Sequence, residues 1–581
     1  MGACYTVRTG PLGRDSARYM GSKGAKSKSS NERGNASVSL CWFESCLYVW
    51  LGSNARGSQR RVIFLACLWS MCATAALMGA VPTHQYGHDI FTLLDNGWRV
   101  ISGQRAHVDY ASPWGPVMSL TAGLGLTLSG YSVDGIGYAS ALVGLLVGLW
   151  SYRLGRDRFE SSPRILSSLF LAALVVAPYA LGTFPWYSSH AMVYNRYGYA
   201  LVGLVMLEAF QPAGGEKRRA AEWFGGISSG AALALALFLK ASFFLVALAF
   251  LGASLLLRRP PRQRLLGLSV GFSLVALALL AYLRFDVLAM LRDLQMAAGA
   301  RSESLSALGI ISAAWYSAVQ FLVVLLLGFA ASWFLESAGP RWRRFQLPLV
   351  AVLVIVADIG LLSTNAQYAG LPLVAVFALI VVNRVTTRQR ELPETEARSA
   401  RRYYAVLLSL GGLLFLPQFA SDIFGLGYGA WQKASPSEPA SVLRFTEPRL
   451  APLLLYDGGI PRSNGRTYTT YINDGVALLR KATSPKETVL TMDVANPFPY
   501  VLGRPPALGG IAAAAYKNTL SDTHRPSDDR YFGNSDIVMV PKRPSADDMY
   551  WVGFYKIYEQ GLLRRYSLAA ESDWWYLLRR K

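Results

Sequence analysis

Apolar residues gather in long runs along most of this chain, and these runs do not alternate with polar positions as they do in soluble proteins. A helix needs about 20 predominantly apolar residues to cross a membrane, and most of the runs approach that length. The pattern predicts a polytopic α-helical membrane protein with about eleven transmembrane helices. The predicted spans are 62–81, 135–152, 165–184, 197–210, 225–239, 242–257, 265–283, 306–334, 347–362, 367–383 and 403–420.

One further apolar run, Val117–Leu128, is short and contains glycines. If it lies at the membrane surface instead of spanning, all the loops rich in Arg and Lys fall on the side of the N-terminus. Cytoplasmic loops carry an excess of Lys and Arg, so we expect a surface helix here. The N-terminus is then cytoplasmic, loop 82–134 is periplasmic, and the tail from Ser421 onward lies outside the inner membrane.

These assignments divide the chain into three parts. Residues 1–61 form a basic cytoplasmic segment for which disorder is one option, and residues 62–420 form the transmembrane domain. Residues 421–581 begin with a Pro/Gly-rich stretch and then show a helical pattern at Asp474–Lys481 and strand patterns at 488–493 and 536–540. About 140 residues are enough to bury a core, so we expect a C-terminal soluble α/β domain in the periplasm.

Composition agrees with the membrane class. The chain is 52% hydrophobic and only 16% charged, against about 25% charged residues in soluble proteins. The net charge of +21 would suggest nucleic acid as a partner of a soluble protein. Here the basic residues fall in alternate loops, where they orient the helices, and we expect no nucleic-acid partner. The cysteines and histidines show no zinc-ligand spacing.

The polar segment with the most side chains that could take part in a reaction is Tyr86–Pro116, which follows the first span. His88 and Asp89 open an amphipathic helical pattern that stops near Gly103. A carboxylate at this position can act as a general base on a hydroxyl or hold a divalent cation, Mg²⁺ or Mn²⁺. Asp89 is equally typical of a helix N-cap, which is the structural alternative.

The rest of this segment and the later outer loops add groups that can bind a polar substrate. His88 and His107 are expected to hydrogen-bond a substrate, while Asp109 and Tyr110 order a substrate loop. Lys240 lies at an outer turn between two apolar runs, and Arg196 ends an outer loop; both are natural partners for phosphate. A short outer loop supplies further hydrogen-bonding side chains for a sugar or head group: Asn365, Gln367 and Tyr368.

The membrane part resembles the GT-C superfamily of polyprenyl-phosphate-dependent glycosyltransferases. The features that carry the resemblance are His88-Asp89 after the first span, the step from Gly103 into His107–Tyr110, the Ser112–Pro116 run and the lysine at a tight outer turn. The chain is similar in style to aminoarabinose transferases, protein O-mannosyltransferases and rhizobial lipopolysaccharide core transferases. It departs from them in having Asp89-Ile90 where many members carry Asp-Glu, and in lacking a lysine before Pro113.

The resemblance implies that Asp89 is the catalytic acid of the first outer loop, with Lys240 and Arg196 left to bind the donor phosphate. The predicted function is transfer of a sugar from a polyprenyl-phosphate donor to a periplasmic lipid or cell-envelope glycan. This chemistry requires no cofactor, although binding of a divalent cation at Asp89 is an alternative that stays open. Two other classes stay open as well, a flippase or transporter for a lipid-linked saccharide and a non-catalytic envelope scaffold.

Overall fold

A computed structural model describes most of the chain, at residues 55–211, 218–257, 260–335, 344–364, 367, 369–435, 442–456, 465–543 and 548–581. Two compact units are present, Met1–Ser58 and Gln59–Lys581. Every element below belongs to the second unit, apart from the first residues of α2. Predictions made for residues 1–54, for Asn365 and for Tyr368 lie outside the described residues.

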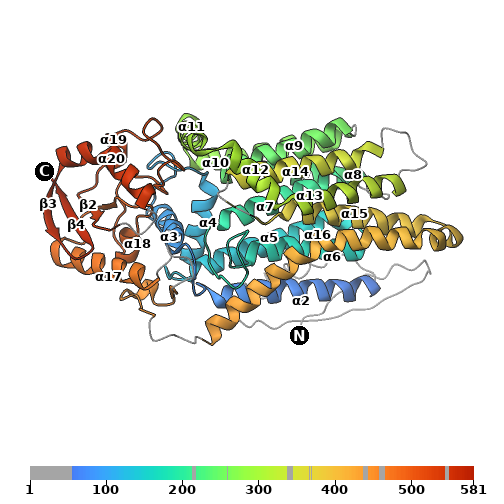
Figure 1. The fold of residues 1–581 in the computed structure, drawn as a ribbon, viewed down its shortest axis with the longest axis horizontal. Helices are drawn as coiled ribbons and strands as arrows, with labels where there is room; N and C mark the ends of the chain where they lie inside the picture. Colours follow the sequence, from blue (N-terminus) through green and yellow to red (C-terminus); the bar gives the residue numbers. More distant parts are fainter. Residues whose placement is uncertain are drawn as a thin grey trace, which may run out of the picture. The chain divides into compact units, whose positions relative to one another are not determined.

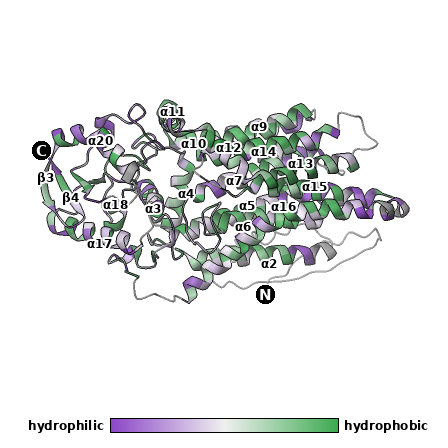
Figure 2. Cartoon of the chain, viewed as in Figure 1, coloured by the Kyte–Doolittle hydropathy of each residue, from purple (hydrophilic) through white to green (hydrophobic). Residues whose placement is uncertain are grey.

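Helices make up the membrane part, and each predicted span falls on a helix (Figure 1). The helices are α2 (Ala55–Met78), α5 (Gly135–Leu154), α6 (Ser161–Val176), α7 (Val193–Ala209), α8 (Arg218–Leu239), α9 (Ala241–Leu257), α10 (Arg262–Tyr282), α12 (Ala307–Tyr316), α13 (Ala318–Leu335), α14 (Gln346–Thr364), α15 (Pro372–Glu391) and α16 (Glu394–Ala434). Of the described helices, seven are long and apolar enough to cross a membrane. Hydrophobic colour covers α9, α10, α13 and α14 (Figure 2). The predicted class, a polytopic helical membrane protein, is confirmed, whereas the count of eleven spans stays a prediction.

Several of the predicted boundaries are wrong. The run predicted as one span at 306–334 is two helices, α12 and α13, with Ser317 between them. The last span does not end near residue 420, because α16 continues for 41 residues to Ala434. Pro417 lies inside this helix. Helical structure also begins earlier than predicted at the N-terminal side, because α2 starts at Ala55 rather than at Val62.

Two helices lie in loop 82–134, where the sequence predicted helices. The first, α3 (Gly87–Ile101), is strongly amphipathic, and the second, α4 (Pro116–Leu128), packs against α3 and α5. At about 1.5 Å per residue, α4 has a length of only ~20 Å, which is short for a bilayer core of ~30 Å. The predicted position of α4 at the membrane surface stays a prediction. A third helix outside the predicted spans, α11 (Val287–Ser304), lies between the spans predicted at 265–283 and 306–334.

The C-terminal residues build a small mixed sheet in the order β1-β2-β4-β3. Its strands are β1 (Val489–Thr491), β2 (Ile537–Pro541), β3 (Tyr566–Glu571) and β4 (Trp575–Arg580). Strands β1 and β2 are parallel, and the others pair antiparallel. Helices α17 (Gly465–Ala482), α18 (Phe498–Leu502), α19 (Asp528–Phe532) and α20 (Asp548–Arg565) complete the region. The predicted helix and both predicted strands are present, so the α/β class of the tail is confirmed.

The sheet region is joined to the loop between α3 and α4 through hydrogen bonds of the main chain. Ala111 donates to the carbonyl of Gly510 (3.1 Å) and accepts from the amide of Ala512 (2.9 Å). Gly509 donates to the carbonyl of Asp109 at 2.7 Å. Loop 106–111 is therefore held against the C-terminal region, and the helices on either side of this loop are fixed with it.

Candidate functional site

Asp89 lies in the first turn of α3, where the chain reverses through Tyr86. Tyr86 has the left-handed backbone angle φ 56° and is the N-cap of the helix, which has no side-chain cap. The interpretation of Asp89 as a helix cap is therefore wrong. Its carboxylate instead contacts the ring of His88, with 3.3 Å between Oδ1 and Nε2, and remains 27% exposed.

The surroundings of Asp89 suit a base. Burial raises the pKa of the Asp89 carboxyl above its ordinary value, and the charge of a protonated His88 opposes this rise. A carboxylate with a raised pKa holds a proton more strongly, which brings it closer to the ideal pKa for general base catalysis near neutral pH. His88 is placed where the sequence predicted it, beside the acid.

Lys240 occupies the short break between α8 and α9, and its ammonium lies over an aromatic ring. Its Nζ is 5.0 Å from the centre of the Tyr194 ring, which stacks on Trp114 with 5.1 Å between ring centres. Such a cation–π contact stabilises the charge. The pKa of Lys240 is lowered to about 7, first by burial and second by the positive charge of Arg301.

The loop that carries Trp114 is positioned by a close backbone contact. The amide of Gly115 donates to the carbonyl of Leu239 at 3.0 Å. A Cβ at Gly115 would lie 2.0 Å from the carbonyl oxygen of Phe238, so only glycine allows this approach. The Ser112–Pro116 run is thus fixed against the end of α8, next to Lys240.

Arg301 near the end of α11 supplies a second cation to the same place. Its guanidinium donates to the carbonyl of Ser363 at 2.8 Å and to the side chain of Asn518 at 3.3 Å. The charges of both Arg301 and Asp89 act on the phenol of Tyr194, and the charge of Arg301 acts on Lys240. Tyr194 therefore contacts Lys240 and lies within electrostatic range of Asp89 and Arg301.

The arrangement gathers groups from separate segments at one end of the membrane helices. Asp89 comes from α3, Tyr194 from the first turn of α7, Lys240 from the α8–α9 turn and Arg301 from α11. Aromatic faces pack against sugar rings, cations bind phosphate, and the carboxylate can accept a proton. Among the described residues, no group of three or more His, Cys, Asp or Glu side chains is placed to hold a metal ion.

The other residues predicted in this loop lie away from Asp89. His107 is fully buried with φ 69°, and its Nδ1 is 3.1 Å from Oδ2 of Asp293. Asp109 accepts the amide of Arg105 at 2.7 Å, which closes a local turn. Tyr110 is also buried, and its hydroxyl contacts Asn96 and Ser119. Their predicted roles in substrate binding stay predictions, and the observed contacts are structural.

Two further predicted residues are tied to partners of their own. The guanidinium of Arg196 donates to Asp422 at 2.9 Å and to the carbonyls of Leu174 and Tyr179, all within the helical part. Gln367 donates to the carbonyls of Ala369 and Gly370, which shapes its own loop. Arg196 is thus engaged in a buried ion pair. The cation near Lys240, a place that the sequence analysis gave to Arg196, is Arg301.

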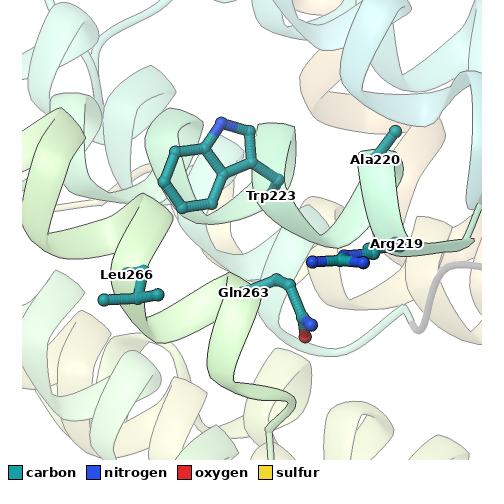
Figure 3. Close-up of a pocket in the computed structure, with 5 residues that line it drawn as sticks. All are labelled: Arg219, Ala220, Trp223, Gln263 and Leu266. Atoms are coloured by element: carbon teal, nitrogen blue, oxygen red, sulfur yellow. The ribbon is translucent and has the colours of Figure 1, made fainter.

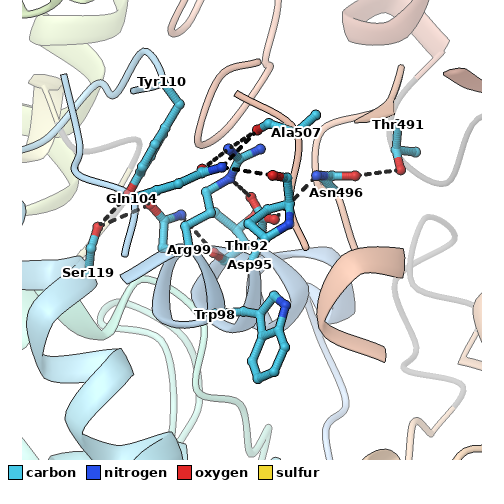
Figure 4. A network of polar contacts seen from close by, with 12 residues as sticks. Thr92, Asp95, Trp98, Arg99, Gln104, Tyr110, Ser119, Thr491, Asn496 and Ala507 are labelled. Carbon is cyan, nitrogen blue, oxygen red and sulfur yellow. Dashed lines mark hydrogen bonds and ion pairs between the residues drawn. The ribbon is translucent and has the colours of Figure 1, made fainter. Parts of the chain in front are cut away.

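The C-terminal region contacts two of the helices that carry site residues, α3 and α11. In α3, Arg99 donates to Asp95 at 2.8 Å and also to the carbonyls of Ala507 and Gly509 (Figure 4). Asn496 of the C-terminal region reaches the same aspartate at 3.3 Å. Buried ion pairs of this kind are costly to break. The contact orients α3 and, with it, Asp89.

On α11, the C-terminal region is bound near both ends of the helix. Arg530 donates to both carboxylate oxygens of Asp293 and to the carbonyl of His107. At the other end, Glu303 accepts from Ser521 and lies 3.0 Å from His524. Because Arg301 lies between these anchors, the C-terminal region sets the position of this cation.

A separate hollow lies at the opposite end of α8. It is lined by Arg219, Ala220, Trp223, Gln263 and Leu266, from α8 and α10 (Figure 3). Arg219 precedes Lys240 by 21 residues of α8 and its adjoining turn, so the hollow is about 30 Å from the Lys240 turn along the helix. It takes no part in the arrangement around Tyr194.

Sequence reasoning missed three members of the site. Trp114 lies in the Ser112–Pro116 run and Tyr194 lies two residues before Arg196, but nothing in the sequence shows that the two rings stack. Arg301 was missed because it lies between the predicted spans 265–283 and 306–334, where no helix was predicted. The sequence feature that could have identified Arg301 is a basic residue in the last turn of a helix, α11. The start of this helix is marked by its N-cap, Asp286, whose side chain accepts a hydrogen bond from the amide of Ala289.

Comparison with known proteins shows only distant similarity. No protein-family model and no curated protein matches the sequence. A crystal structure of ArnT from Cupriavidus metallidurans in the apo state is similar, with 14% identity, a TM-score of 0.46 and coverage of 90% of this chain and 98% of that chain. The structure of ArnT bound to undecaprenyl phosphate has 13% identity, a TM-score of 0.39 and the same coverage. These values describe a loose likeness of fold.

Proposed function

We propose that this chain is a membrane glycosyltransferase of GT-C type that moves a sugar from a polyprenyl-phosphate donor to an acceptor hydroxyl. The acceptor is a lipid or glycan of the cell envelope on the periplasmic side of the bacterial inner membrane. The observation that carries the proposal is that Lys240 lies over the ring of Tyr194, while the charges of Asp89 and Arg301 act on the same phenol.

Each group has a chemical task in this reaction. Asp89 accepts the proton of the acceptor hydroxyl while its oxygen attacks the anomeric carbon of the sugar. The bond between that carbon and the phosphate oxygen breaks, and the polyprenyl phosphate leaves with the electron pair. Lys240 and Arg301 stabilise the negative charge that grows on the phosphate. A phosphate is a weak base, so its departure requires no strong general acid.

The aromatic pair and the membrane setting fit the same substrate. Trp114 and Tyr194 present stacked rings against which a sugar face packs. The site lies at the ends of apolar helices, where the phosphate of a membrane-embedded lipid meets water. A prenyl chain then stays in the hydrocarbon while its head group reaches Lys240.

Mass spectrometry of envelope lipids and glycans from cells with and without the gene tests the proposal. We expect one species to lose the mass of a single sugar when the gene is deleted, and the wild-type gene to restore it. A flippase would give a different result. A lipid-linked saccharide would accumulate on the cytoplasmic side when the gene is deleted, and the purified protein would form no glycosidic bond.

A further inference from the structure

Helices α8 and α10 contact each other along two pairs of glycines, each pair spaced by four residues. The glycines are Gly226 and Gly230 of α8, and Gly267 and Gly271 of α10. A Cβ at Gly226 would lie 2.2 Å from the carbonyl oxygen of Arg264. A Cβ at Gly267 would lie 2.5 Å from the carbonyl oxygen of Trp223. Small residues at this spacing let membrane helices approach closely, so α8 and α10 run side by side and begin at the same end.

The hollow described above lies beside the start of this helix contact and has a volume of about 540 Å³. Two of its lining residues, Arg219 and Trp223, are four residues apart on α8, and two others, Gln263 and Leu266, are three apart on α10. Each pair therefore lies on one face of its helix. The polar side chains of Arg219 and Gln263 lie together below the Trp223 ring in the view of Figure 3. A hollow of this size accommodates a small ligand or a lipid head group.

Arg219 brings an uncompensated positive charge to the hollow. This arginine is exposed, and it has no hydrogen bond or ion pair with any other residue that the structure describes. Two further exposed arginines, Arg218 and Arg262, begin the same two helices. The N-terminal ends of helices add partial positive charge of their own. The hollow therefore favours an anion.

The described acids at this end of α7 and α8 are already neutralised. Glu208 pairs with Arg158 at 3.2 Å and with Arg264 at 2.7 Å, and Glu222 lies 4.0 Å from Arg158. All four side chains are buried. The exposed arginines beside the hollow thus keep their charge for a ligand at the membrane boundary.

An apolar path leads away from the hollow along α10. Leu266 is 59% exposed, and exposed apolar side chains continue at Val270, Leu274 and Leu277. Steps of three and four residues form one stripe on a helix, and this stripe faces the hydrocarbon of the membrane. An acyl chain packs against such a stripe, whereas a free anion gains nothing from it. The ligand expected at the hollow therefore has both an anionic group and an apolar chain.

We propose that this hollow binds an anionic glycerophospholipid, a lipid whose head group has a net negative charge. Arg219 binds the phosphate, the amide of Gln263 donates to the head group, and an acyl chain follows the stripe on α10. None of the lining residues is an acid that could bind the ammonium of a zwitterionic lipid. In the predicted orientation this end of α8 is cytoplasmic, and basic pockets between membrane helices on that side bind anionic head groups. The inference concerns lipid binding far from Lys240, so it stands or falls separately from the proposed transfer reaction.

Thermal unfolding of the purified full-length protein in detergent tests this site. The probes are phosphatidylglycerol, phosphatidylcholine with the same acyl chains, and inorganic phosphate. We expect a saturable rise of several degrees in the melting temperature with phosphatidylglycerol alone. Half of the maximal rise should require about fivefold more lipid in Arg219→Gln, because one positive charge at the hollow is lost. It should require the wild-type amount in Arg156→Gln, which removes an exposed arginine from the turn after α5, outside the hollow.

Four results would overturn the proposal. An equal rise with phosphatidylcholine would show that the charge of the head group has no role. An equal rise with inorganic phosphate would identify a site for a free anion. An Arg219→Gln variant that responds to phosphatidylglycerol like wild type would place the lipid elsewhere, and a wild-type protein that shows no rise would bind no such lipid.

Discussion

Lys240 offers a sharp prediction because its charge at neutral pH depends on what binds beside it. In the free protein, burial and the neighbouring Arg301 lower the pKa of Lys240 to about 7. A bound phosphate raises this pKa again, since an opposite charge favours the protonated amine. Below pH 7 the amine is already protonated and binding is strongest. Above pH 7 the proton must be taken up on binding, so affinity falls.

The magnitude follows from the chemistry of one charged contact. A hydrogen bond to a charged group contributes about 1.5–3 kcal/mol, so replacing Lys240 by Met should weaken binding of polyprenyl phosphate by roughly 10- to 150-fold. In wild type, the dissociation constant should rise by up to about tenfold per pH unit above pH 7. In the Met variant this rise should vanish.

Titration of polyprenyl phosphate into protein in nanodiscs between pH 6 and pH 9 measures both effects. Lys240→Arg is the matched control, because its guanidinium stays protonated over the whole range. We expect this variant to bind with little dependence on pH. A wild-type curve that is flat above pH 7, or a Met variant that keeps the wild-type slope, would refute the role of Lys240.

Three further variants test the neighbouring parts of the account. Arg301→Met should weaken binding of the same lipid by about 1.5–3 kcal/mol at every pH, and a pH-dependent loss in the titration would contradict this. Arg99→Met leaves Asp95 buried without its cation and should reduce stability by about 3–5 kcal/mol, measured by denaturation; an unchanged midpoint would argue against the α3 anchor. Gly115→Ala should raise the KM for the donor because the new Cβ meets a backbone carbonyl 2.0 Å away, and unaltered kinetics would show that the loop can shift.

The membrane helices were predictable because the length of an apolar run is a local property of the sequence. The same local rule failed at two places. Nothing in residues 306–334 breaks the apolar run, yet the chain divides at Ser317. Beyond residue 420, glycines and polar residues suggested a loop, whereas α16 continues and its Lys433 donates to Ala80 at 2.9 Å. Contacts with distant residues stabilise these segments, and a window of sequence does not contain them.

The candidate site was predictable only in part, for a similar reason. Asp89 and Lys240 could be proposed because an acid or a base at a membrane boundary is unusual in itself. Arg196 had the same signal, but its partner, Asp422, is 226 residues away and binds it in a structural pair. Likewise His107 is bound to Asp293. Whether a cation faces a ligand depends on the ion pairs that it forms with residues distant in the sequence.

The most direct test of the central claim is the envelope composition of cells whose only copy of the gene carries Asp89→Asn. Asp157→Asn is the matched control, because Asp157 lies in the turn after α5, pairs with Arg153 at 3.5 Å and has no part in the proposed transfer. If Asp89 is the base, the Asp89→Asn protein should accumulate to wild-type levels while mass spectrometry shows an acceptor that lacks one sugar. A fully glycosylated acceptor in those cells would contradict the account.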